Sequence, residues 1–169
     1  KKISTSNYQH GIDYEYLTVY EMKLLAGRNF SPRILSDTLG SAYIVNEAAV
    51  RAFGWGEPEN ALGKPFKGAG QTGSIIGVVK DFHFNSLQEA IAPVALYLTH
   101  PNSFTRIAVR LHAGQIAGAI KFNEQAWRKH FPGELLQYSF MNERLLGQYQ
   151  AEELFGRIFM TFVVLSLAI

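Results

Sequence analysis

The segment from Thr105 to Phe140 reads TRIAVRLHAGQIAGAIKFNEQAWRKHFPGELLQYSF. Apolar and polar residues alternate over its first part, which predicts a strand at 105–112. Apolar residues then recur at helical spacing, which predicts a helix at 115–131 that the following Pro-Gly pair ends. A further strand is expected at 135–140. The order strand, helix, strand indicates a βαβ or split-βαβ unit.

The residues before this segment carry the signs of further short helices and strands. Asn46 is expected to cap a helix at 47–53, which Gly54 then ends. Asp13 is expected to cap a helix at 14–22 in the same way. The other expected elements are strands at 42–45, 74–84 and 93–99, a strand or extended segment at 23–30, helical pieces at 58–62 and 86–91, and loops at 31–40 and 100–104. Residues 64–67 and 74–84 flank a glycine-rich loop. Together these patterns predict an α+β fold.

The last residues, 158–169, read IFMTFVVLSLAI and carry no charge. This run is shorter than the roughly 20 residues that cross a bilayer. It has no polar face, however, whereas a helix on a protein surface would have one. We therefore expect the start of a truncated transmembrane helix in a fragment of a larger membrane protein. The alternative is a buried C-terminal helix.

The polar stretch 142–157 leads into this apolar run without a helix breaker and is expected to form a stalk helix. Asn142 is its expected cap, and Glu143 lies where the positive end of the helix dipole favours an acidic side chain. Tyr149 is expected to pack on the domain, with Glu153 mostly on the other side.

Charge and cysteine content exclude several classes of site. The chain has 16 Lys and Arg against 14 Asp and Glu, a net charge of +2, and no basic cluster. A sequence-independent nucleic-acid binder would gather positive charge on one face or tail, so nucleic acid is not an expected partner. The absence of cysteine excludes disulfides, thiolate zinc sites and cysteine nucleophiles.

Two local motifs match known functional patterns but give only weak evidence of function. The stretch Gly68 to Gly73 reads GAGQTG and matches the dinucleotide pattern G-x-G-x-x-G. That pattern binds a pyrophosphate only where a helix follows it, whereas here a strand is expected to follow, so we expect a flexible hairpin loop without nucleotide. The triplet Asn29-Phe30-Ser31 fits the glycosylation pattern, which often arises by chance.

The run Lys80-Asp81-Phe82-His83-Phe84 groups three ionisable side chains. In a strand, Asp81 and His83 would share one face while Phe82 and Phe84 would fill the other, holding this part of the chain together. Asp81 and His83 could act as an acid–base pair or metal ligands, but no His-x-x-x-His motif or second acidic cluster supports chemistry. We expect a structural or conformational role and assign no catalytic, cofactor-binding or metal-ligating residue.

Five ordered segments resemble one family. They are DYEYLTVYEMKLLAGRNFS (13–31), AYIVNEAAVRAFGW (42–55), ALGKPF (61–66), IIGVVKDFHFNSL (75–87) and YSFMNERLLGQYQAEELFGRIF (138–159). Together they resemble the extracytoplasmic core domain of MacB-like and FtsX-like ABC transporter permeases, in the form common in Bacteroidetes. The resemblance covers nearly the whole chain.

The resemblance implies two small lobes and a membrane anchor. Residues 1–22 and 100–141 would form a porter-like βαβ lobe, and residues 23–99 an inserted α/β lobe. Residues 142–157 would be the stalk and 158–169 the start of the transmembrane helix. Members of the family usually carry a longer N-terminal stretch, so the porter lobe is expected to be incomplete and to leave an open sheet edge.

The resemblance also implies a role and partners. The domain would lie on the periplasmic side of the inner membrane. It would couple ATP hydrolysis by a cytoplasmic ATP-binding subunit to conformational change, which is called mechanotransmission. This coupling would serve efflux, lipoprotein or peptide export, or cell-envelope regulation. Expected partners are that subunit, a second permease copy or half, a periplasmic adaptor or lipoprotein, and membrane lipid through the C-terminal helix. No enzyme activity and no cofactor are expected in the domain itself.

Two other functions stay open from the sequence. One is a ligand-sensing extracytoplasmic domain of a membrane receptor. The other is a small metal-dependent hydrolase that uses Asp81 and His83.

Overall fold

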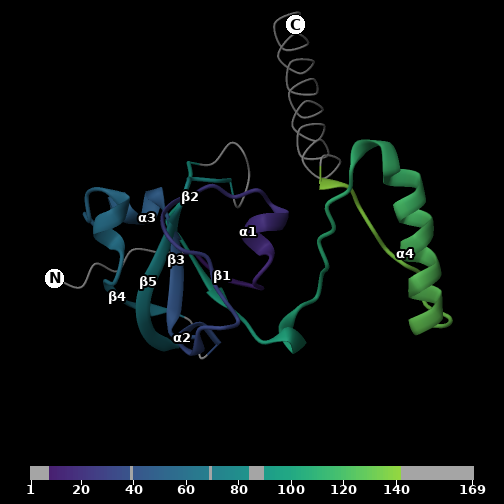
Figure 1. Ribbon diagram of the computed structural model, residues 1–169, viewed down its shortest axis with the longest axis horizontal. Coiled ribbons are helices and arrows are strands. Elements are labelled where there is room, and N and C mark those ends of the chain that lie inside the picture. The colour runs from purple at the N-terminus through teal and green to yellow at the C-terminus, as the bar shows by residue number, and fades with distance from the viewer. Residues whose placement is uncertain (1–7, 39, 69, 84–89, 142–169) are drawn as a thin grey trace, which may run out of the picture. The chain divides into compact units, whose positions relative to one another are not determined.

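The short apolar strand β3 (Ala42–Asn46) lies at the centre of a mixed sheet, and all five of its residues are buried. A computed structural model describes residues 8–38, 40–68, 70–83 and 90–141 (Figure 1). On one side β3 pairs antiparallel with β6 (Val94–Leu98). On the other side it pairs parallel with β5 (Gln71–Val79).

Three more strands complete a six-stranded sheet. Strand β1 (Tyr8–Ile12) pairs parallel with β6 at one edge. The nine-residue β5 is long enough to hold two antiparallel partners: β4 (Pro65–Gly68) at its first part and β2 (Leu24–Gly27) at its end. The strand order is β1-β6-β3-β5-β2, with β4 beside β5.

Both faces of the sheet are covered, which explains why β3 is apolar throughout rather than alternating. Tyr43 and Val45 pack into one core together with helix α3 (Glu47–Ala52). Ala42 and Ile44 point to the opposite face and pack into a second core with helix α1 (Tyr16–Val19). The two helices therefore lie on opposite sides of the sheet (Figure 1).

The sequence predicted several of these elements correctly. The amide oxygen of Asn46 accepts a hydrogen bond from Ala49 N at 3.1 Å and caps α3, and Gly54 follows the helix with φ of +66°. The 3-10 helix Pro58–Ala61 begins at its proline. The expected strands at 42–45 and 93–99 are confirmed as β3 and β6.

Other elements differ from the expectation. Helix α1 is a single turn whose cap residue is Glu15, because Asp13 instead accepts the Glu15 amide in a local turn. The expected loop at 31–40 contains a turn of helix, α2 (Leu35–Thr38). Most of the expected helix at 86–91, namely residues 86–89, lies outside the described part of the chain.

Contacts divide the chain into two compact units, 1–110 and 111–169. The described part of the second unit contains the 3-10 turn Ala113–Gln115 and helix α4 (Ile116–His130), which confirms the expected helix. The rings of Trp127 and Phe131 pack at 4.4 Å between centroids at its end.

The expected strands at 105–112 and 135–140 are wrong. Both segments lack regular secondary structure, and Ile107 and Leu135 are 86% and 89% exposed. An alternating pattern gives a strand only where a neighbouring strand supplies hydrogen-bond partners, and no strand among the described residues pairs with either segment. Of the expected βαβ unit, only the helix is present among the described residues.

A 3-10 turn, Pro101–Ser103, precedes the segment at 105–112.

The expected lobe boundary at residue 23 does not separate two sheets, because β1 (Tyr8–Ile12) pairs with β6. The division into a porter-like and an inserted lobe stays a prediction. The expected stalk (142–157) and transmembrane start (158–169) lie outside the described residues. Within the described ranges, the helices are too short or too polar for any of them to cross a membrane.

Candidate functional site

The Lys80–His83 segment, singled out from the sequence, lies beyond the end of β5 rather than within a strand. The idea that Asp81 and His83 share one strand face is therefore wrong. The backbone amide of Lys80 still donates to the carbonyl oxygen of Lys23 at 2.8 Å, and the chain then turns toward the start of α3.

Asp81 joins the chain beyond the end of β5 to helix α3 by three hydrogen bonds. Its Oδ1 accepts the amide of Ala48 at 2.8 Å, and its own amide donates to Oε2 of Glu47 at 2.9 Å. Its Oδ2 accepts Nη2 of Arg51 at 2.5 Å. The bonds are reciprocal, so helix and segment fix each other in the manner of a capping box formed between distant residues.

Asn46 completes this junction from the other side. While its Oδ1 caps α3, the same atom accepts the amide of Val94 at 2.9 Å, and its Nδ2 donates to the carbonyl oxygen of Ala92 at 2.9 Å. Asn46 is 1% exposed, and the two bonds that its Oδ1 accepts are buried, where losing a partner is costly. Strand β3, helix α3 and strand β6 therefore meet at one amide side chain. We call Asn46, Glu47, Arg51 and Asp81 the α3 junction.

The remaining residues of the segment divide between core and solvent. Phe82 is half-buried and packs against the core that contains Leu17 and Ile44. Lys80 and His83 are exposed. Five other residues singled out from the sequence lie outside the described residues, namely Phe84, Asn142, Glu143, Tyr149 and Glu153.

This geometry is suited to holding elements together. Both carboxylate oxygens of Asp81 are occupied by donors of α3, and no bond joins that carboxylate to the exposed His83. Over the described ranges there is also no group of three or more His, Cys, Asp or Glu side chains placed to hold a metal ion.

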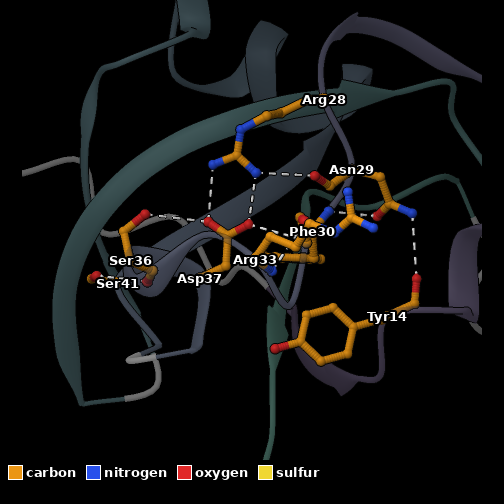
Figure 2. A network of polar contacts seen from close by, with 9 residues as sticks. Tyr14, Arg28, Asn29, Phe30, Arg33, Ser36, Asp37 and Ser41 are labelled. Atoms are coloured by element: carbon orange, nitrogen blue, oxygen red, sulfur yellow. Dashed lines mark hydrogen bonds and ion pairs between the residues drawn. The ribbon is translucent and has the colours of Figure 1, made fainter.

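A second polar cluster, which the sequence did not reveal, surrounds Asp37 (Figure 2). Figure 2 shows the guanidinium of Arg28 against both oxygens of this carboxylate, at 2.6 and 2.9 Å. The amide of Ser31 also donates to Asp37 at 2.9 Å, and the hydroxyl of Ser36 lies 3.4 Å away. Arg28 and Asp37 are nine residues apart, a separation that fits neither a helical nor a strand period, so only the fold brings the pair together.

Asp37 is fully buried and remains favoured as a carboxylate. Burial acts to raise its pKa, but the hydrogen bond and charge of Arg28, together with the bonds from Ser31 and Ser36, outweigh burial and hold the pKa below its usual value. The pairing in turn raises the pKa of Arg28, chiefly through the hydrogen bond to Asp37.

The asparagine of the glycosylation triplet is part of the same loop. Asn29 is half-buried; its Oδ1 accepts the amide of Phe30 at 2.8 Å, and its Nδ2 lies 3.4 Å from the carbonyl oxygen of Tyr14. The side chain therefore packs inward, which does not suit a glycan acceptor.

The glycine-rich loop is a tight hairpin between β4 and β5, with Gly68 paired to Gln71. Gly70 has φ of +79°, a conformation that side chains disfavour. The hydroxyl of Tyr43 donates to the carbonyl oxygen of Gly68 and lies 3.1 Å from that of Gln71. A strand follows the loop, as expected, so the arrangement offers no helix N-terminus to a phosphate.

No protein-family model matches the sequence, and no curated protein matches it. Solved structures do. The chain is similar to extracytoplasmic transporter domains. The periplasmic region of MacB from Actinobacillus actinomycetemcomitans is 21% identical with a TM-score of 0.47, over 72% of this chain and 55% of that chain. The extracellular domain of the ABC-type transporter YknZ from Gram-positive bacteria is 21% identical with a TM-score of 0.48, over 72% of this chain and 63% of that chain.

A domain of a permease protein from Porphyromonas gingivalis is also similar, at 19% identity and a TM-score of 0.47, over 79% of this chain and 69% of that chain. The chain spans 55% of the MacB region and 63% of the YknZ domain.

Proposed function

We propose that this chain is an extracytoplasmic domain of an ABC transporter permease, and that it couples ATP hydrolysis in the cytoplasm to conformational change outside the inner membrane. An ATP-binding subunit and a second permease copy or half are its proposed partners. Efflux, lipoprotein or peptide export, and cell-envelope regulation are the transport roles that fit such a domain.

The observation that carries this proposal is where the polar residues of the family-like segments lie. Asn46 and Glu47 from one segment meet Asp81 from another in the α3 junction, and Asn29 from a third lies beside the Arg28–Asp37 pair. In each case the polar groups bond to backbone or to one another. A domain that transmits force needs elements that are fixed to one another in this way, because packed elements move as rigid bodies.

The hydrolase alternative is less favoured by this geometry, because its proposed Asp81 is engaged on α3 and its proposed His83 is exposed and unlinked to it. The receptor alternative is tested by the coding sequence that follows Ile169. Several further apolar spans would support a permease. A single span followed by a kinase-like region would support a receptor.

A distance measurement tests the coupling directly. The chain has no cysteine, so Glu57→Cys and Gln125→Cys, both at exposed positions, can carry spin labels on the first and second compact units. In the intact permease with its ATPase partner, we expect the label-to-label distance distribution to differ between the ATP-bound and nucleotide-free states. A matched pair within the first unit, Glu57→Cys with Lys67→Cys, should keep one distribution. An unchanged distribution for the first pair would contradict the proposal.

A further inference from the structure

Helix α1 ends in a tightly bonded turn. The amide of Met22 donates to the carbonyl oxygen of Leu17 at 2.8 Å, and the amide of Glu21 donates to that of Thr18 at 3.2 Å. These two bonds are those of a Schellman motif, and the apolar residues at its two ends, Leu17 and Met22, belong to the same core, as is common for this motif.

The motif has an acidic residue where glycine is usual. Glu21 has φ of +51° and is the only residue other than glycine with positive φ among the described residues. Glycine is favoured at this place because it has no Cβ to strain the left-handed conformation. The position therefore presents a carboxylate, 73% exposed, directly beyond the end of the helix.

One carbonyl at the helix end is bonded by a distant side chain. The carbonyl oxygens of residues 15–18 all accept amides of the turn. The next carbonyl oxygen, that of Val19, accepts Nε of Arg110 at 2.8 Å. The same guanidinium forms an ion pair with Glu21 through Nη1. Arg110 thus completes the cap of α1 by two contacts, and a cation is favoured at a helix C-terminus.

Arg110 is also the last residue of the first compact unit. The segment 104–110 that leads to it has no regular structure and is exposed throughout. The cap of α1 is therefore the place where the chain is fastened just before it passes into the second unit.

We propose that Arg110 and Glu21 form an ionic latch that fastens the chain at its exit from the first unit, and that opening of this latch lengthens the free connector into the second unit. A connector that is bonded to the first unit passes a displacement of one unit directly to the other, whereas a free connector takes up that displacement by changing its own conformation. The use of the latch in coupling rests on the proposed function. Its existence does not, and the experiment below concerns the chain alone.

Limited digestion with trypsin measures the latch, because the connector contains two arginines. Initial rates of the first cut after Arg106 and after Arg110 are read by intact mass on the full chain in mild detergent. Glu21→Gln removes the charge and keeps the side-chain length, whereas Glu21→Gly also relieves the backbone. We expect both variants to raise the rate after Arg110 at least threefold relative to the rate after Arg106. The control Glu57→Gln, at an exposed carboxylate elsewhere, should leave that ratio unchanged.

Salt provides a second readout of the same bond. Because the ion pair is exposed, added salt should screen it and raise the ratio of the two rates in the original chain but not in Glu21→Gln. An unchanged ratio in both Glu21 variants would overturn the latch. A rise in Glu21→Gly alone would also overturn it, since the backbone rather than the carboxylate would then hold the connector. These outcomes are independent of whether the intact permease couples ATP hydrolysis to movement.

Discussion

At the scale of single residues, Asp37 links the folding of the first unit to pH. Burial acts to raise the pKa of its carboxyl, but the hydrogen bond and charge of Arg28 outweigh burial and hold that pKa below its ordinary value. The folded state therefore binds a proton less readily than the unfolded state does. The resulting stabilisation is fully present above about pH 4 and is lost as the pH falls through the lower pKa of the folded state.

Asp37→Asn should remove this pH dependence. At neutral pH we expect a loss of about 3 kcal/mol in the free energy of unfolding, the lower end of the range for breaking a buried pair, because Arg28 keeps partial access to water. The measurement is urea unfolding between pH 2 and 7. The difference between the two proteins should shrink as the pH falls below about 4. The exposed Asp13→Asn is the control. A constant difference across the pH range would contradict the role assigned to Asp37.

Asp81 and His83, which the sequence treated as a pair, should differ in their effect on stability. Asp81→Ala leaves the amide of Ala48 without its partner and frees Arg51, so it should cost about 2 kcal/mol of unfolding free energy. His83→Ala changes an exposed side chain and should stay within about 0.5 kcal/mol. Urea unfolding at pH 7 ranks the two. A larger effect of His83→Ala would show that the α3 junction is not what stabilises this region.

At the scale of elements, the pairing of β3 with β5 depends on a close approach of backbones. A Cβ placed on Gly73 would lie 2.0 Å from the carbonyl oxygen of Ser41, which accepts the amide of Ser74 at 2.9 Å. Gly73→Ala should therefore force β3 and β5 apart and cost about 3 kcal/mol, the upper part of the range for overpacking.

Thermal unfolding of Gly73→Ala checks this, with Gly118→Ala as the control. Position 118 lies in α4 with no atom within 4 Å of an added Cβ, so alanine there should keep or raise helicity.

Isothermal titration with ATP should give no binding to either variant or to the original chain, since the glycine-rich loop is a hairpin. Nucleotide binding lost in Gly73→Ala alone would reverse that reading of the loop.

Some of these elements could be predicted from the sequence and others could not. The β3–α3 turn was predictable because Asn46, the apolar run before it and Gly54 after the helix are all local signals. The absence of strands at 105–112 and 135–140 was not predictable, because an alternating pattern does not show whether a partner strand is present. The Arg28–Asp37 pair and the contact of Asp81 with α3 were likewise hidden, since both depend on chain segments brought together only by the sheet.

At the scale of the whole molecule, the first compact unit is a sheet with helices on both faces, bonded across its elements at the α3 junction and around Asp37. Such a unit is expected to respond to force as one body. Any movement imposed through the C-terminal part of the chain would then depend on how stiff the connecting segments are. That dependence is why the stalk matters to the proposed coupling.

The expected stalk, residues 142–157, lies outside the described residues, and its helix stays a prediction from the sequence. A continuous helix resists bending, so movement in the membrane would reach the domain with little loss. Inserting Pro after Gln150 removes a backbone hydrogen bond and clashes with the preceding turn, which costs about 3 kcal/mol or more and kinks a helix. Inserting Ala at the same place is the matched control for the added length.

In the intact permease, we expect the Pro insertion to leave the domain folded and ATP hydrolysis active while transport falls well below that of the Ala insertion. Transport and ATP hydrolysis measured together in proteoliposomes separate the two effects, and circular dichroism of the 169-residue chain checks folding. If the Pro insertion transports as well as the Ala insertion, a rigid stalk is not the route of coupling. Movement would then have to reach the domain through the segment that Arg110 fastens or through contacts with a second copy.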